Sequence, residues 1–145
     1  TTGSSNVAIG NLSLLSQNGS TANTAVGYNA GRSITTGVQN VFMGTFAGDA
    51  FTDSDFNVAI GYAALTADTL GDRSIAIGHS VLGTQNFATS TQAYNTAIGH
   101  NAGAAFTTGI SNTLLGGLAG DAITDADSNI AIGLNALTTE STTLI

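Results

Sequence analysis

The sequence predicts an all-β protein, a parallel β-solenoid of eight 17-residue coils, and three observations support this. The motif Asn-Val-Ala-Ile-Gly at residues 6–10 returns seven times in near-copies. The copies are spaced by 17 residues, apart from one interval of 21 residues. The motif is rich in β-branched residues, which favour strands. A short fixed period is typical of proteins in which one unit stacks on the next.

Composition excludes several functions. The chain has 145 residues, with two Arg, no Lys and nine acidic residues, and its net charge is −7. Nucleic-acid binding needs Lys and Arg to displace counterions from phosphates, so we expect no nucleic-acid partner. The sequence has no Cys, which excludes a disulfide or zinc–cysteine framework. It has no run of about 20 apolar residues, so we expect no membrane insertion.

The repeats define the domain organisation. Numbered from the Asn of the motif, the coils begin at residues 6, 23, 40, 57, 74, 95, 112 and 129. Residues 1–5 match the end of a repeat, so we interpret the chain as a slice of a longer array. The four-coil block 6–73 returns as 74–145, with a four-residue insertion within 74–94. We expect the inserted residues to form a protruding loop.

Positions 4 and 5 of the coil are the most regular. Position 5 is always Gly, which suits a turn or a close approach of backbones at the end of a strand. Position 4 is always apolar, and we predict that both positions form the structural core. They are Ile9, Val26, Met43, Ile60, Ile77, Ile98, Leu115 and Ile132 at position 4, and Gly10, Gly27, Gly44, Gly61, Gly78, Gly99, Gly116 and Gly133 at position 5.

Neither face of the predicted strands is polar. Positions 2 and 4 share one face, and position 3 lies on the other. Position 2 is Val, Ile or Thr, and position 3 is Ala except for Phe42 and Leu114. A strand without a polar, solvent-exposed face must be covered on both sides. The opposite wall of the coil supplies one cover, and we expect another chain to supply the second.

Positions 9 and 12 vary together in all eight coils. Leu at position 9 accompanies a polar residue at position 12, and Gly at position 9 accompanies a bulky apolar one. Protein interiors tolerate neither voids nor overpacking, so we predict one pocket per layer that is filled from either position. The predicted fillers are Leu14, Leu65, Leu82 and Leu137 from position 9, and Ile34, Phe51, Phe106 and Ile123 from position 12.

Position 1 is Asn in seven coils and Ser74 in the fifth coil. Stacked Asn side chains bond along a parallel stack as a ladder. We therefore predict an Asn ladder that is interrupted at Ser74.

The motif copies at residues 6–10 and 23–31, the second reading Asn-Thr-Ala-Val-Gly-Tyr-Asn-Ala-Gly, resemble the repeat arrays of phage tail fibres and tail spikes. They are also similar to the head repeats of trimeric autotransporter adhesins, although those repeats are shorter. The resemblance covers residues 6–145. It implies a left-handed β-roll or β-helix, a homotrimer packed around one axis, and a virion or extracellular location. The expected function is a structural fibre or stalk that presents a receptor-binding tip for host attachment.

Two groups of residues are candidate metal ligands, although we expect no cofactor. Carboxylates at short spacing suit Ca²⁺, but solvated loop acids are the favoured interpretation. Two histidines at position 6 would form stacked rings in a trimer that hold a transition metal, but the same column also contains tyrosines. The candidates are Asp49, Asp53, Asp55, Asp121, Asp125 and Asp127 for the first group, and His79 and His100 for the second.

The alternative function is an adhesin-type or carbohydrate-binding head. Its contact with a host surface glycan or receptor would be the loop 86–94, through Asn86, Phe87 and Tyr94. Exposure of both aromatic rings would favour sugar stacking, and burial of both would indicate a packed bulge.

Two further classes receive less support. The chain has no nucleophile motif and few aromatic residues, so we predict that it is not an enzyme. A Thr row at position 13 suggests ice binding as a remote alternative, but the row is interrupted, and Thr is common in strands. The row consists of Thr35, Thr52, Thr69, Thr107 and Thr124.

Overall fold

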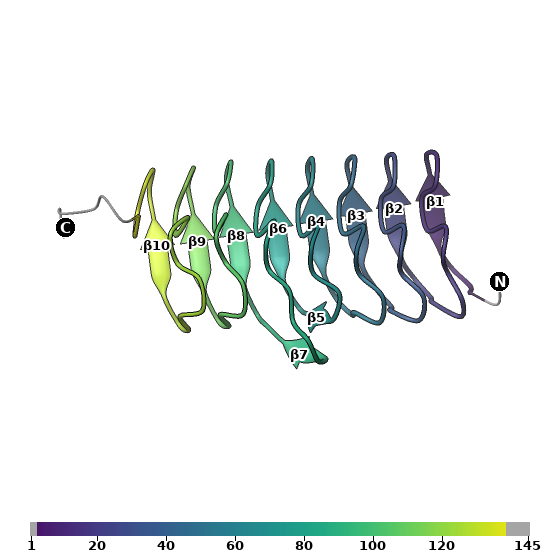
Figure 1. Cartoon of the computed structure of the whole chain (residues 1–145). Helices are drawn as coiled ribbons and strands as arrows, with labels where there is room; N and C mark the ends of the chain where they lie inside the picture. Colours follow the sequence, from purple (N-terminus) through teal and green to yellow (C-terminus); the bar gives the residue numbers. More distant parts are fainter. Residues whose placement is uncertain (1–2, 139–145) are drawn as a thin grey trace.

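The computed structural model describes residues 3–138 and confirms the predicted parallel β-solenoid. The coils stack side by side along one axis, with the two termini at opposite ends (Figure 1). The main sheet has eight parallel strands in the order β1-β2-β3-β4-β6-β8-β9-β10. They are β1 (Val7–Ile9), β2 (Thr24–Val26), β3 (Val41–Met43), β4 (Val58–Ile60), β6 (Ile75–Ile77), β8 (Thr96–Ile98), β9 (Thr113–Leu115) and β10 (Ile130–Ile132).

The strand register follows the sequence period. Val7 pairs with Thr24, 17 residues later, and this offset is kept from β1 to β6. Ile75 pairs with Thr96, so the 21-residue interval is absorbed without a shift in register. Each motif copy therefore lies directly beside the next one in space.

The coil with the insertion forms a second, small sheet together with the preceding coil. Strand β5 (Gly71–Asp72) pairs in parallel with β7 (Thr91–Gln92). Figure 1 shows β7 displaced outward from the row of coils, as the loop prediction expected. The loop is tied to the preceding coil by this pairing.

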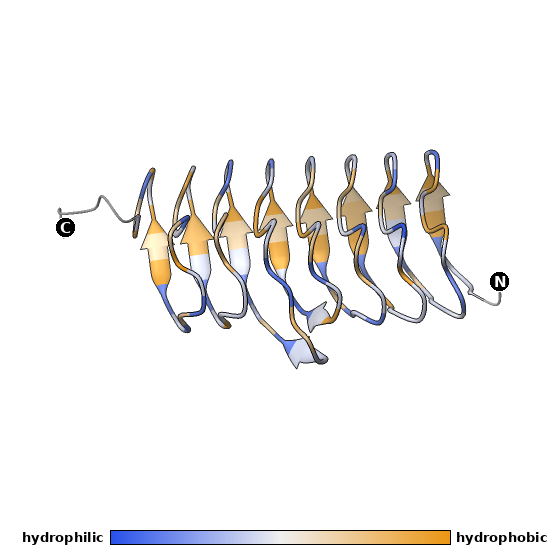
Figure 2. Ribbon diagram, viewed as in Figure 1, coloured by the Kyte–Doolittle hydropathy of each residue, from blue (hydrophilic) through white to orange (hydrophobic). Residues whose placement is uncertain are grey.

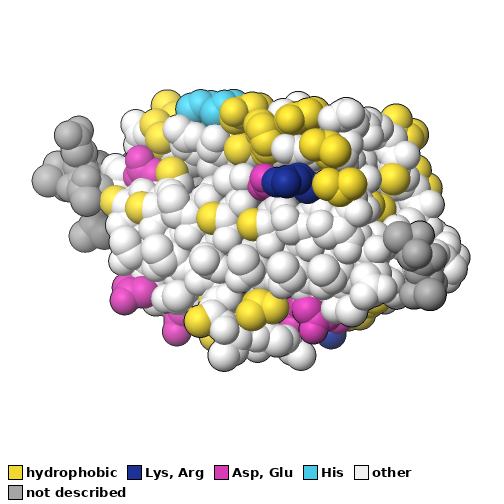
Figure 3. All heavy atoms as spheres, turned by 45° about the vertical axis from the view of Figure 1, so that its right-hand side comes forward, with side chains coloured by type: hydrophobic (Ala, Val, Ile, Leu, Met, Phe, Trp, Pro, Cys, Tyr) yellow, Lys and Arg dark blue, Asp and Glu magenta, His cyan; other side chains and the backbone are white. Residues whose placement is uncertain are grey.

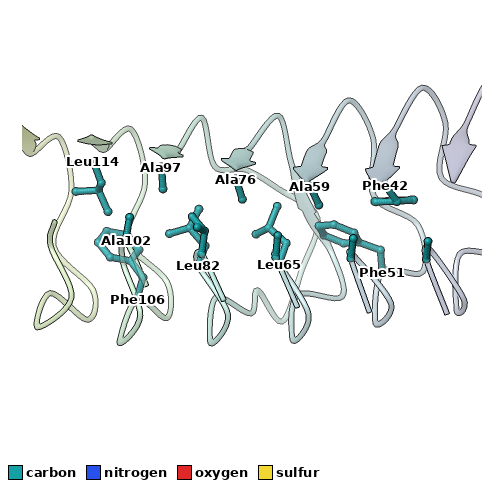
Figure 4. Close-up of a cluster of buried hydrophobic side chains, with 14 of the residues drawn as sticks. Phe42, Phe51, Ala59, Leu65, Ala76, Leu82, Ala97, Ala102, Phe106 and Leu114 are labelled. Atoms are coloured by element: carbon teal, nitrogen blue, oxygen red, sulfur yellow. The ribbon is translucent and has the colours of Figure 1, made fainter. Parts of the chain in front are cut away.

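The inward face of the main sheet is formed by position 3. Ala25, Phe42, Ala59 and Ala76 are all inaccessible to solvent. In Figure 4 the position-3 side chains point toward larger side chains from the opposite wall, such as Leu65 and Leu82. The interior of the coil is narrow, so Ala on the strand is complemented by Leu or Phe from the other side.

The position-4 residues lie on the opposite, outward face, which corrects their assignment to the core of the chain. Ile9 is 59% exposed, Met43 45% and Ile132 65%. Figure 2 shows the strands as mainly hydrophobic, yet only one of their two faces is enclosed by the chain itself. The position-5 glycines end the strands, and all except Gly133 pack against the glycine of the next coil.

The pocket prediction is confirmed in the interior of the stack. Leu65, Leu82 and the rings of Phe51 and Phe106 are fully buried. The structure adds that the bulky position-3 residues share the same space. A Cβ atom placed on Gly120 would lie 2.7 Å from a methyl carbon of Leu114. Leu137, in the last coil, is 43% exposed, and its predicted polar partner Glu140 lies outside the described residues.

The Asn ladder is confirmed, although its main bonds run from side chain to backbone. The Oδ1 atom of Asn23 accepts the backbone N–H of Asn40 at 2.9 Å, and the Nδ2 group of Asn23 donates to the carbonyl of Gly37 at 2.8 Å. Ser74 cannot continue this pattern. In its place, Gln85 reaches inward, and its Oε1 atom accepts the Asn95 side-chain amide at 2.9 Å.

Candidate functional site

The outward face of the main sheet is a stripe of uncharged side chains. We call positions 2 and 4 of all eight strands the outer stripe. It contains only Val, Ile, Leu, Met and Thr. Val7 at one end is 46% exposed, Leu115 is 44% exposed, and Ile130 near the other end is 72% exposed. Contiguous apolar patches of this kind mark interaction surfaces on soluble proteins.

The insertion places its three predicted contact residues differently. Phe87 is only 5% exposed, and a Cβ atom on Gly71 would lie 2.8 Å from its ring. Asn86 is exposed, and its side-chain oxygen accepts the hydroxyl of Thr69 at 3.0 Å. Tyr94 is 52% exposed. The loop is therefore anchored by one aromatic residue and displays the other.

Tyr94 stands beside Arg73 and Phe56, which the sequence analysis did not identify. The Cζ atom of Arg73 lies 4.5 Å from the centroid of the Phe56 ring and 5.9 Å from that of the Tyr94 ring. We call these three residues the arginine clamp. All three hold the last position of successive coils, and this shared position is the signal that would have revealed them.

A buried polar network supports the loop from inside. The Asp68 carboxylate is fully buried, and it accepts the backbone N–H of Gly71 at 3.0 Å and the side-chain amide of Gln85 at 2.6 Å. The same Gln85 amide contacts Ser74, and its oxygen accepts from Asn95. Burial raises the pKa of Asp68 above its ordinary value, whereas these hydrogen bonds act in the opposite direction.

This network predicts a pH-dependent difference between the wild-type chain and Asp68→Asn. Because burial raises the folded-state pKa above 3.8, the protonated carboxyl favours the folded state. The stabilisation is complete below the unfolded pKa and is lost as the pH rises through the folded pKa. Asn does not titrate. We expect the free energy of unfolding of wild type minus variant to fall as the pH is raised above 3.8, in urea titrations at several pH values. A difference that is constant with pH would contradict this.

Five of the six aspartates predicted as calcium ligands accept hydrogen bonds from separate neighbours, whereas the Oδ1 atom of Asp121 is buried without a partner among residues 3–138. Asp55 accepts the backbone N–H of Val38 at 2.8 Å, and Asp127 accepts that of Ile110 at 2.8 Å. Within residues 3–138, no group of three or more acidic or His side chains converges on a point that could hold a metal ion. Figure 3 likewise shows the acidic side chains in separate places on the visible face. The calcium hypothesis therefore stays a prediction without a converging ligand set. The six residues are Asp49, Asp53, Asp55, Asp121, Asp125 and Asp127.

The environment of Asp55 reflects its position at the corner of the coil. Burial raises its pKa, and the hydrogen bond from Val38 opposes this rise. The carboxylates of Asp72 and Asp53 raise the pKa further, while Arg73 lowers it. Asp55 is thus a backbone acceptor beside the arginine clamp.

The two histidines belong to an exposed row of stacked rings. His79 and His100 lie with centroids 5.2 Å apart and planes inclined by 19°, and His79 stacks on Tyr62 at 5.1 Å. Phe46 continues the row from Tyr62 to Tyr28 in edge-on contacts. In Figure 3 the histidines, in cyan, lie at an edge of the molecule beside hydrophobic side chains. The stacking shows an aromatic column; the metal prediction for this pair remains untested.

Four of the five position-13 threonines direct their hydroxyl groups to the next coil, whereas that of Thr124 donates to the Asp125 side chain. The hydroxyl of Thr35 donates to the carbonyl of Thr52 at 3.0 Å, and that of Thr52 donates to the carbonyl of Thr69 at 3.1 Å. Thr107 makes the same bond to the next coil. These bonds favour a role in holding adjacent coils together over the presentation of hydroxyls to ice.

Comparison with known proteins finds no family model, no curated protein and no solved structure that matches the chain. The resemblance of the motif to tail-fibre and adhesin repeats therefore stays a prediction. Residues 3–138 contain no helical segment with the length and apolarity of a membrane span.

Proposed function

We propose that this chain is a structural segment of a homotrimeric fibre, a stiff rod in a phage tail fibre or tail spike. Its role there is to present a receptor-binding tip for host attachment, at the virion surface. The tail-fibre assignment draws on the resemblance of the repeated motif. The observation that carries the trimer is the outer stripe, which runs unbroken over eight strands and is not covered by the chain itself.

A second copy of the same chain is the occupant that best fits the outer stripe. The chain has a net charge of −7, so most of its surface repels another copy. The stripe carries no charged residue, because all nine acidic residues lie outside positions 2 and 4. A flat apolar face of this kind is where copies approach without electrostatic cost, and its burial stabilises the assembly.

The mass in solution tests this proposal. Light scattering on the purified chain is expected to give three times the 14.4 kDa chain mass. A monomer at micromolar concentration would contradict the trimer.

The variant Ile77→Asp is expected to convert the trimer into a folded monomer. Ile77 lies in β6 on the outward face and is half-buried in the single chain. The new carboxylate stays hydrated in a monomer, whereas the interface would bury it without a partner. Light scattering measures the mass, and far-UV circular dichroism checks that the strands remain.

Leu15→Asp is the matched control, because Leu15 is 54% exposed and lies outside the outer stripe. This variant is expected to keep the trimer mass. If Ile77→Asp also kept the wild-type mass and melting temperature, the stripe would not be an interface.

The second candidate function is a carbohydrate-binding module on the same rod. It is favoured by the exposed ring of Tyr94 beside a half-buried arginine, at the only insertion that interrupts the repeats.

A further inference from the structure

The arginine clamp holds one of the only two arginines in the chain. Its guanidinium group lies between the rings of Phe56 and Tyr94, which are 40% and 52% exposed. Cation–π contacts of this kind hold an arginine side chain in place through its flat faces. Its terminal Nη groups, rather than the enclosed Nε group, remain for a ligand.

These N–H groups have no partner among residues 3–138. The Nε atom of Arg73 is enclosed and makes no hydrogen bond within this part of the chain, and no ion pair of the guanidinium group is found there either. A guanidinium group carries five N–H donors in one plane. The enclosed Nε donor is costly to leave without an acceptor, and a ligand would reach the guanidinium group through its Nη groups, which make no hydrogen bond within this part of the chain.

The insertion adds polar groups that bond to Tyr94 and to Asp72. The Tyr94 hydroxyl donates to the Gln92 side-chain oxygen at 2.8 Å, and Gln92 is exposed in β7. The neighbouring Ser90 hydroxyl donates to Asp72 at 3.2 Å. The tyrosine whose ring contacts the guanidinium group is therefore itself bonded to a surface amide.

We propose that the arginine clamp binds a carboxylated sugar, with the carboxylate on Arg73 and the sugar ring beside Tyr94 and Phe56. The planar N–H fork of arginine matches the two oxygens of a carboxylate. The rings offer apolar surface to the C–H groups of a sugar, and Gln92 offers hydrogen bonds to its hydroxyls. This proposal deepens the carbohydrate-binding candidate and does not depend on the fibre role.

The aspartates beside the clamp favour a ligand with a single negative charge over a dianion. The Asp55 carboxylate accepts the N–H of Val38, and the Asp72 carboxylate accepts that of Asp55, both at 2.8 Å. Asp55 stands close enough to Arg73 and to Asp72 for both charges to influence its pKa. Their charges disfavour a phosphate dianion more strongly than one carboxylate.

The second block does not repeat the clamp, so the part of the chain that the structure describes has one such site. Ser128 stands where the first block has Phe56, and the insertion occurs only once. Among residues 3–138, the aromatic and charged residues of this column are Phe56, Arg73 and Tyr94, and they stand in adjacent coils.

The NMR signals of the two arginines give a direct test of ligand binding, with Arg73 as the site and Arg32 as the reference. The side-chain Nε–Hε groups of Arg73 and Arg32 can be observed in ¹⁵N NMR spectra of the full chain and assigned with Arg73→Gln. The probes are a tetrasaccharide that contains glucuronic acid and a neutral glucose tetrasaccharide. We expect the acidic probe alone to shift the Arg73 signal, with Arg32 unchanged, and added salt to weaken the effect. No shift at millimolar probe, or equal shifts for both arginines, would overturn the proposal.

Substitutions in the clamp distinguish a loss of ligand affinity from a loss of folding or assembly. Calorimetry with the acidic probe is expected to show at least about a tenfold loss of affinity for Arg73→Gln and an unchanged affinity for Arg32→Gln. Tyr94→Ser should weaken binding while the fold is kept, because Ser111 and Ser128 occupy the same column. If Arg73→Gln lowered the mass from trimer to monomer and wild type did not bind the probe, the clamp would be a contact between copies and the proposal would fail.

Discussion

Gly61→Ala is expected to unfold the chain or to lower its free energy of unfolding by roughly 3 kcal/mol or more. Gly61 has a φ of +124°, a region that is essentially closed to residues with a side chain. A Cβ atom there would also lie about 2.2 Å from the carbonyl oxygen of Gly78 in the next coil. Because that atom belongs to the backbone, relief would require the two coils to separate. Thermal and urea unfolding measure the loss.

Two other glycines separate the causes of this loss. Gly133 has a φ of +122°, but a Cβ atom there would meet nothing within 4 Å, so Gly133→Ala should show the backbone strain alone. Gly117 lacks a positive φ, and its nearest contact is a methyl carbon of Leu134 at 3.3 Å. Gly117→Ala should therefore be close to neutral. Equal losses for Gly61 and Gly117 would contradict the proposed role of the position-5 turn.

Replacing the leucine at position 3 and introducing one at position 9 of the same coil is expected to show that the two positions share one pocket. Leu114→Ala should cost about 2–5 kcal/mol, because Leu114 is 1% exposed and its removal leaves a cavity. Gly120→Leu should cost about 1–3 kcal/mol by overpacking against Leu114. The double variant keeps the total volume, and Leu82 shows that the equivalent backbone accepts leucine at a φ of 48°. We expect the pair to be more stable than the sum of the single losses predicts.

A double-mutant cycle of urea unfolding measures this coupling. The control pairs Gly120→Leu with Leu65→Ala, three coils away, and these two changes should be additive. Additive losses in the adjacent pair would show that positions 3 and 9 do not compete for one space.

The period of the sequence was sufficient to predict the coils, their register and the Asn ladder. Each of these features depends on a residue type that recurs at the same position from coil to coil. Asn23 and Asn40, both at position 1, are an example. The alternation of Leu and Gly at position 9 likewise predicted the shared pocket. A closed interior holds a fixed volume, so a large residue at one position requires a small one at the other. Such features follow from spacing and size, which a single sequence displays directly.

The inward face of the strands could not be predicted in this way. Both faces of each strand are apolar. The sequence therefore lacks the alternation of polar and apolar residues that distinguishes a solvent-exposed face from a buried one. The larger residues at position 4, such as Ile60, were assigned to the core, but the structure encloses the smaller Ala59. The physical reason is the thinness of the coil, in which the opposite wall already supplies bulky groups.

Tyr94 was predicted as a contact residue, but its neighbours Phe56 and Arg73 in the arginine clamp were missed because of their backbone conformation. Phe56, Arg73 and Tyr94 have φ values of 61°, 61° and 51°, in the left-handed region that such residues seldom adopt. Residue type alone therefore gives no sign that these positions form a corner of the coil. Comparing the same position across coils, rather than neighbours along the chain, would have brought the three residues together.

The hydrogen bonds between coils, including the Asn ladder, run along the axis of the stack. Each coil is bonded only to its two neighbours, so tension applied at the two ends loads these contacts in series. The chain would then lengthen in steps, one coil at a time. Each step would release about 55 Å of extended chain, and a longer step would mark the coil that carries the insertion.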